Sequence, residues 1–359
     1  MKQILDLQLQ EILTNVNHIP CISLVINFEP KLSGRNELEQ KLKAHQQRIE
    51  RQLVQEYPSE KAMPLVEKLQ AAIRNVNYNS YKKSLALYVS ENIQKTYYLN
   101  IEVTEKSIID DSFEIRDLVL SKKEQRKFLV LHVAEQHSSF YVFEEGQLSR
   151  IRTNSFSHLR HKLGDLPAIV DMEKQRQILV EKFLLLTDEC IPGILSDHPF
   201  PIFVLGKENI VSGFKKISNS LPSIIRFIVG EFDVLNERQV AAVLSPHLDQ
   251  WKQVFVQSLL MRVEAAFSAS LLACGMEEVW TEAYRNNCRL LIVEKDYSCP
   301  AQHGATADQI MITGTTSGFY IKDAVDDAIE MVLLNGGDVE FVEPGSLRHF
   351  NQIAAIRVK

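Results

Sequence analysis

The sequence predicts an α/β protein built from three successive α/β domains. Apolar segments typical of strands, such as residues 21–28 and 201–206, alternate with patterns in which apolar residues recur every three or four positions. The chain has 359 residues, of which 45% are hydrophobic, and this length suits roughly two to three domains. We expect a mainly parallel mixed sheet in the middle domain and a small α/β/α sandwich in the last.

The first predicted domain spans residues 1–122. It opens with an apolar strand at residues 21–28. Two helical patterns follow, with Asn36 and Ser59 as the expected N-caps. An Asn- and Ser-rich break then separates these helices from a hairpin at residues 84–101. Strand, helices and hairpin together predict one α/β unit.

The second predicted domain spans residues 123–245. The polar run at residues 121–127 is expected to be the connector that leads into it. Apolar segments then alternate with helical patterns, and Gly146 supplies a turn between two of them. This alternation favours a mainly parallel sheet with helices on its faces. The expected strands are residues 128–134, 139–143, 148–152, 201–206 and 223–229.

The third predicted domain spans residues 246–359 and begins with the longest helical pattern of the chain. Ser245 is the expected N-cap, Pro246 takes the first helical position, and Gly275 is expected to end the helix. A second helix is predicted at residues 321–335, between short apolar strands. The long helix that begins at Pro246 is suited to bridging two domains.

Composition and charge exclude several classes of protein. The chain has 40 Lys and Arg residues against 46 Asp and Glu residues, a net charge of −6. Proteins that coat nucleic acid indiscriminately are usually basic, so we expect any RNA contact to come from a local patch. No apolar run approaches a membrane span, and the first residues lack the features of a secretory signal. Five cysteines at irregular spacing predict no disulfide framework and a reducing, cytoplasmic compartment.

Motifs of nucleotide binding and hydrolysis are absent from the sequence. It contains no G-x-G-x-x-G and no G-x-x-x-x-G-K-[ST], so neither a dinucleotide fingerprint nor a Walker loop is present. It also contains no G-x-S-x-G and no H-E-x-x-H. We therefore expect no cofactor.

Two groups of side chains are candidates for a metal site. Cys288, Cys299 and His303 lie close in sequence, but their spacing departs from that of zinc sites and no fourth ligand is evident. The acids from Asp323 to Glu330, which include Asp326 and Asp327, are the other group, since paired carboxylates can hold magnesium. Acids are, however, favoured in the first turns of a helix by its dipole, and they normally lie on its outer face. We therefore expect no metal.

A basic segment at residues 148–163 is the most informative feature. It contains no acid, and so forms a positive island in an acidic chain. Its side chains suit contact with the phosphates and sugars of RNA, and a solvated surface segment beside acidic residues is the alternative. No paired acid or base accompanies it, so we assign no catalytic residue. The candidate RNA-binding residues are Arg150, Arg152, His158, Arg160, His161 and Lys162.

The order of the segments carries a resemblance to a known family. Its main stretches are HIPCISLVINF, the two helices and the hairpin after it, FLVLHVAEQHSSFYVF, and the ending IKDAVDDAIEMVLLNGGDVEFVEPGSL…IAAIRV. In these stretches the chain resembles the bacterial homologues of the archaeal and eukaryotic class-one peptide-release factors and Pelota. The similarity covers nearly the whole chain and extends to the group of ribosome hibernation factors that includes Balon.

The resemblance implies a three-domain protein that binds in the ribosomal A site. The middle domain would reach toward the peptidyl-transferase centre, and the last would meet a translational GTPase such as elongation factor Tu. The Gly-Gly-Gln tripeptide of the release factors is absent from the sequence. The Gly-Gly pair that the sequence does contain, Gly336–Gly337, is followed by Asp338. The codon-reading Asn-Ile-Lys-Ser motif is absent as well. Both absences argue against codon-directed peptide release and favour binding without hydrolysis.

We therefore expect a non-enzymatic, cytoplasmic ribosome-binding factor. It would act in hibernation, as part of a stress response, or in the rescue of stalled ribosomes. The first alternative is a hydrolase that acts on peptidyl-tRNA or RNA, through an unusual residue at 153–170 or through the acidic helix and a metal. The second alternative is a protein–protein adaptor.

Overall fold

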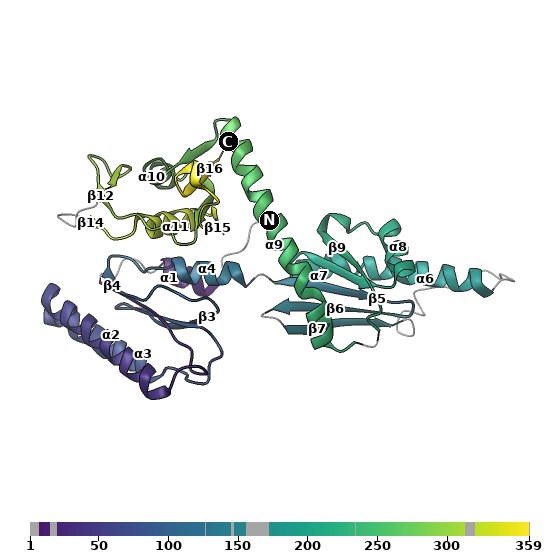
Figure 1. The fold of residues 1–359 in the computed structure, drawn as a ribbon, viewed down its shortest axis with the longest axis horizontal. Coiled ribbons are helices and arrows are strands. Elements are labelled where there is room, and N and C mark those ends of the chain that lie inside the picture. Colours follow the sequence, from purple (N-terminus) through teal and green to yellow (C-terminus); the bar gives the residue numbers. More distant parts are fainter. Residues whose placement is uncertain are drawn as a thin grey trace. The chain divides into compact units, whose positions relative to one another are not determined.

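The structure is a computed structural model that describes residues 7–14, 20–125, 127–144, 147–155, 172–233, 235–312 and 320–358. Over these residues it is a mixed α/β protein, which confirms the predicted fold class (Figure 1). The chain divides into two compact units, one made of Met1–Glu124 with Phe255–Lys359 and the other of Gln125–Val254. The first and last segments thus share one unit, and their division into two separate domains stays a prediction.

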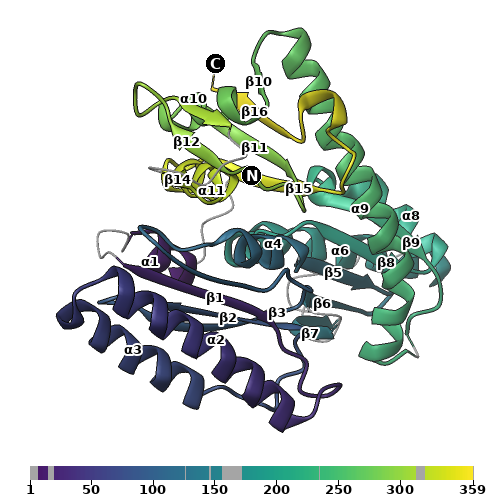
Figure 2. The same ribbon diagram turned by 60° about the vertical axis from the view of Figure 1, so that its left-hand side comes forward.

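A four-stranded antiparallel sheet forms the first part of the Met1–Glu124/Phe255–Lys359 unit. In spatial order its strands are β3 (Gln94–Leu99), β2 (Ser84–Val89), β1 (Cys21–Asn27) and β4 (Lys106–Asp110). Helices α2 (Arg35–Glu56) and α3 (Ser59–Arg74) lie together on one face (Figure 2). Their apolar residues, such as Leu42 and Leu69, pack on Leu24 of the sheet, as the helical spacing of these residues predicts.

Two further helices, α1 (Leu7–Thr14) and α4 (Arg116–Glu124), contribute to the core on the other face of this sheet. The polar run at residues 121–127 is predicted as a connector, but its first residues belong to α4. The helix forms because Leu118 and Val119 bury an apolar side in this core. Lysines in its last turn complement the helix dipole.

The second sheet of this unit forms the predicted small α/β/α sandwich. In spatial order its strands are β10 (Leu272–Cys274), β16 (Ile353–Arg357), β11 (Cys288–Glu294) and β15 (Asp338–Val342). The last part of α9 (Glu237–Ser268) packs on one face through Leu259 and Val263. Helices α10 (Met276–Tyr284) and α11 (Ala324–Leu334) pack on the other. A small sheet of β13 (Ile310–Ile312), β12 (Ala301–His303) and β14 (Tyr320–Ile321) adjoins them.

The long helix α9 differs from its predicted bounds at both ends. It begins at Glu237, so Pro246 lies inside it and Ser245 is not its N-cap. It ends at Ser268, where Ser270 adopts a left-handed conformation with φ 56° and the amide of Leu271 donates to Ala266 O at 2.8 Å. This is a Schellman ending in which serine takes the place usually held by glycine. None of the helices among the described residues is long and apolar enough to cross a membrane.

One core joins the first and last segments of the chain. It contains Leu118 of α4 together with Ile329 of α11 and Leu291 of β11. Ion pairs connect the same segments at its border, including Arg116 to Asp323 at 3.1 Å and Lys123 to Asp338 at 2.6 Å. The two sheets of this unit are therefore stabilised by the same buried apolar surface.

The Gln125–Val254 unit is built on a five-stranded mixed sheet. In spatial order its strands are β7 (Gln147–Ser155), β6 (His137–Glu144), β5 (Phe128–Val133), β8 (Ile202–Gly206) and β9 (Ile224–Val229). Strands β5, β8 and β9 are parallel, β6 is antiparallel to β5, and β7 is antiparallel to β6. The mixed sheet with a parallel part confirms the prediction for the middle of the chain.

Helices cover both faces of this five-stranded sheet. Residues of α6 (Met172–Asp188), α7 (Ile191–Asp197) and α8 (Glu208–Ile217) pack on one face. The first part of α9 packs on the other through Leu244 and Leu248. Strands β5, β7, β8 and β9 all end at the same edge of the sheet, which we call the carboxyl edge.

Candidate functional site

The predicted basic segment begins on an edge strand. Arg150 and Arg152 lie on β7, the outermost strand of the five-stranded sheet, and both are exposed. The Arg150 guanidinium pairs with Glu237 at 3.1 Å and lies over the Tyr141 ring, whereas Arg152 Nε donates to Asn154 Oδ1 at 3.1 Å. Among these contacts, Arg150 has a carboxylate partner and Arg152 has none.

The other predicted RNA-binding residues, His158, Arg160, His161 and Lys162, lie outside the described residues. The strand that precedes them in sequence ends at Ser155, which is paired with His137 at the carboxyl edge. The assignment of the basic segment to RNA stays a prediction.

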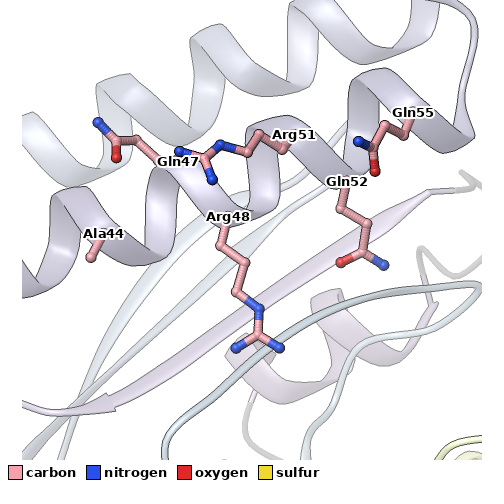
Figure 3. A pocket seen from close by; sticks show the side chains of 6 residues that line it. All are labelled: Ala44, Gln47, Arg48, Arg51, Gln52 and Gln55. Carbon is pink, nitrogen blue, oxygen red and sulfur yellow. The ribbon is translucent and has the colours of Figure 1, made fainter.

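A second cationic surface, which is not among the sites expected from the sequence, lies on α2. Two arginines and three glutamines, with no acid among them, line a hollow along this helix (Figure 3). Guanidinium and amide groups donate hydrogen bonds that suit phosphate and sugar oxygens. The lining residues are Ala44, Gln47, Arg48, Arg51, Gln52 and Gln55.

Three potential metal ligands meet at the carboxyl edge. His132 lies near the end of β5, His137 begins β6, and Asp233 follows β9. Asp233 Oδ1 lies 3.2 Å from His132 Nε2 and 3.8 Å from His137 Nε2, and one ligand atom of each residue lies within 4.8 Å of the others. Within the described part of the chain, this is the one group of three or more His, Cys, Asp or Glu residues that could hold a metal ion.

The turn between β5 and β6 brings the two histidines together. Ala134 N donates to His137 O at 2.9 Å, which closes a tight hairpin. His132 pairs with Ser139 in the ladder, so His137, two residues earlier on β6, lies diagonally across from it on the same face. The two imidazole rings meet edge to face with their centroids 5.3 Å apart.

Asp233 is positioned by the ends of β8 and β9. Gly230 N donates to Gly206 O at 3.0 Å. A Cβ at Gly206 would lie 2.5 Å from Val133 O, so this position needs glycine. Lys207, the next residue, places Nζ 3.0 Å from Glu231 and 3.6 Å from Asp233 Oδ2. The lysine therefore holds the carboxylate oxygen that faces away from the histidines.

Burial controls the protonation of His132. It lowers the pKa of this imidazole below its usual value, against the opposing attraction of Asp233, and His137 lowers it further. His132 is therefore mainly neutral at neutral pH. A neutral imidazole offers a lone pair to a metal ion or to a hydrogen-bond donor.

The metal candidates considered in the sequence have other roles in the structure. Cys288 and Cys299 are buried free thiols, and burial raises the pKa of Cys288 to about 12. His303 is exposed and meets Trp280 edge to face. The three do not form a group of metal ligands among the described residues.

The acidic helix differs from the expectation of a solvated outer face. Asp323 is the N-cap of α11 and accepts the amide of Val325 at 3.1 Å. Asp326 and Glu330 are buried. The expectation is wrong for these residues because the first and last segments of the chain close over this side of α11.

The family comparison covers the Gln125–Val254 unit and the start of the region after it. Residues 127–287 match the model of bacterial archaeo-eukaryotic release factor family 3. The match contains the whole five-stranded sheet, the carboxyl edge, Arg150 and Arg152. Over this range the chain is similar to a bacterial family of archaeo-eukaryotic release factors, which confirms the resemblance found in the sequence.

Several solved structures are similar to the chain at low identity. The archaeal translation termination factor aRF1 is 13% identical, over 98% of this chain and 97% of that chain, with a TM-score of 0.24. Archaeal Pelota, from a model of ribosome-bound Pelota and ABCE1, is 12% identical over 76% of each chain, with a TM-score of 0.45. Dom34 of S. cerevisiae is 11% identical over 78% of this chain and 74% of that chain, with a TM-score of 0.39. A comparison with curated proteins gave no match.

Proposed function

We propose that the chain is a ribosome-associated factor that occupies the A site during hibernation or rescue and releases no peptide under codon control. The observation that carries this proposal is the release-factor family match over residues 127–287 in a chain without a Gly-Gly-Gln tripeptide. The matched range contains the sheet and the start of the basic segment, but not the tripeptide with which release factors act. Binding without hydrolysis is therefore the simpler function.

The proposed contact with ribosomal RNA of the A site and the peptidyl-transferase region uses the basic segment. Exposed Arg150 and Arg152 lie on β7, and among the described residues no strand pairs with the outer side of β7. Cations that neutralise phosphates release counterions, which supplies affinity without sequence specificity. The proposed contacts are Arg150, Arg152, His158, Arg160, His161 and Lys162.

The proposal includes a partner and a compartment. We propose that elongation factor Tu or another translational GTPase binds the C-terminal segment, because the resemblance found in the sequence implies such a partner there. Action on ribosomes places the protein in the cytoplasm. A pull-down of the full chain with purified elongation factor Tu, with and without ribosomes, tests the partner separately from the RNA contact.

Cosedimentation of the purified chain with ribosomes tests the main proposal. Simultaneous replacement of Arg150, Arg152, Arg160 and Lys162 by Ala should weaken binding. The slope of log affinity against log salt should become shallower by about three. The matched control removes four exposed cations from α8 and α9, with the same change of net charge. The control variant carries Lys215→Ala, Lys216→Ala, Arg238→Ala and Lys252→Ala.

The outcomes separate the proposed function from its alternatives. Failure of the parent chain to cosediment at moderate salt would rule out ribosome association. Equal loss in both quadruple variants would show that net charge, and not the basic segment, governs binding. Turnover of peptidyl-tRNA by the purified chain would identify a hydrolase instead, and RNA-free capture of a protein partner without ribosome binding would identify an adaptor.

A further inference from the structure

The three side chains that meet at the carboxyl edge point to a site that the sequence analysis does not predict. We propose that His132, His137 and Asp233 together bind one divalent transition-metal ion, and that the best-matched ion is Zn²⁺. The proposal departs from the expectation of no metal and is independent of ribosome binding. Its failure would leave the proposed function unchanged.

The spacing of the ligand atoms fits a single ion. In a tetrahedral zinc site with bonds of the usual length, neighbouring ligand atoms are about 3.3 Å apart. Asp233 Oδ1 lies 3.2 Å from His132 Nε2 and 3.8 Å from His137 Nε2. One ligand atom of each residue lies within 4.8 Å of the others, so small side-chain rotations would bring all three atoms to bonding distance of one ion.

The donor set selects the kind of ion. Two imidazole nitrogens and one carboxylate oxygen suit Zn²⁺ and related transition metals, whereas Mg²⁺ and Ca²⁺ prefer oxygen ligands. Three protein ligands leave one tetrahedral position open. We assign that position to a water molecule, which the exposed side of the cluster can supply.

The surroundings orient the ligands. Lys207 Nζ pairs with Glu231 at 3.0 Å. The same atom lies 3.6 Å from Asp233 Oδ2, which is the carboxylate oxygen that does not face the histidines. This contact leaves Asp233 Oδ1 directed at the imidazoles. Outer contacts of this kind fix the orientation of metal ligands in known sites.

The burial of the three ligands is graded. The side chains of His132, Asp233 and His137 are 11%, 33% and 42% exposed. The buried Phe232 ring meets the His132 ring edge to face, with the two centroids 6.2 Å apart. An ion can therefore enter from solvent past His137 and reach the more deeply buried His132.

Titration of the chelator-treated full chain with Co²⁺ and Zn²⁺ tests the proposal. Co²⁺ reports the ligands directly, since its absorption differs between thiolate and nitrogen or oxygen coordination. We expect one equivalent per chain, visible bands of a low-coordinate ion and no thiolate charge-transfer band. His137→Gln and Asp233→Asn should each weaken binding by at least about tenfold. Both side chains are partly exposed, so both variants should keep the parent's circular dichroism spectrum.

The matched control is His198→Gln, which changes a half-buried histidine of the same unit outside the cluster. It should bind both ions as the parent does. Three results would each overturn the proposal: no binding of either ion by the parent chain, a thiolate charge-transfer band on cobalt binding, or parental affinity in His137→Gln or Asp233→Asn.

Discussion

Asp326 Oδ1 accepts the backbone amide of Arg116 at 2.7 Å, and so joins two residues that are 210 positions apart in the chain. Its other oxygen accepts the amide of Ile115 at 3.1 Å, and the residue is 1% exposed. These amides lie at the start of α4, where a helix has no intrahelical acceptors for its first N–H groups. A side chain of α11 thus caps a helix of the first segment.

Replacement of Asp326 by Ala should destabilise the unit that contains both chain segments. One buried and one partly buried amide would lose their acceptors, which we expect to lower the free energy of unfolding by about 2–4 kcal/mol. Urea unfolding followed by circular dichroism measures the change. Asp296→Ala, at an exposed position, is the control and should stay within about 0.5 kcal/mol of the parent. Equal stability of Asp326→Ala and the control would show that the amides find other partners.

Replacement of Asp327 by Asn should stabilise the folded state, in contrast to Asp326→Ala, and the gain should depend on pH. Burial raises the pKa of Asp327 to about 8, and Glu330 adds to the shift. The folded state therefore holds a proton that the unfolded state has lost, and stability falls as pH rises from about 4 to about 8. Asn carries no such charge, so the variant should gain about 1–2 kcal/mol over the parent by about pH 8 and little at about pH 5.

Thermal or urea unfolding of the parent and Asp327→Asn in parallel buffers tests this dependence. The measured quantity is the difference between the two proteins at each pH, because Glu330, with a pKa raised to about 7 by burial, titrates in both of them. A difference that is constant or shrinks with rising pH would contradict the assignment of the shift to Asp327.

Replacement of Glu237 by Gln should strengthen RNA binding. Glu237 holds the Arg150 guanidinium at 3.1 Å on the surface, so the substitution frees one cation of the basic segment. An exposed pair of this kind is worth about 0.2–1 kcal/mol, so affinity for ribosomes should rise by a factor between about 1.4 and about 5. The same substitution in an Arg150→Ala background should have no such effect. Cosedimentation of the four proteins measures the coupling, and a gain that persists without Arg150 would contradict the role of the pair.

The five free thiols should differ in reactivity. Cys21 and Cys288 are buried, and desolvation raises the pKa of each to about 12, so neither forms thiolate at neutral pH. Cys190 is half-buried, and Cys274 is half-buried with a pKa raised by burial and Glu278. Alkylation of the native chain followed by peptide mass spectrometry should modify Cys190 first. Early modification of Cys288 would show that β11 opens readily.

Local pattern was enough to predict most elements, because the apolar spacing of a helix or strand is a property of neighbouring residues. The strand at 21–28 and the helix at 321–335 agree closely with β1 and α11. The ends of α9 were not predictable by the same means, since its last turn closes on Ser270 where glycine is usual. Gly275, predicted to end that helix, instead precedes α10 with φ 77°.

The candidate sites depend on contacts between distant segments, which local pattern does not show. His132 and Asp233 are about a hundred residues apart and meet only because β5, β8 and β9 are parallel. One signal was available, namely a histidine in the otherwise apolar strand FLVLHV. For Asp326, likewise, the local pattern predicts an acid on the solvated face of a helix. Only the packing of the first segment over α11 makes this residue a buried hydrogen-bond acceptor.

The shared core of the first and last segments has a consequence for synthesis of the protein. The Gln125–Val254 unit has all of its own core once residue 254 has been translated and has left the exit tunnel, so it can fold while the rest is still being made. The surface of the earlier sheet that faces Ile329 must wait for the final hundred residues. The nascent chain therefore exposes α4 and its apolar side during this interval, and we expect truncated products to be the species most dependent on chaperones.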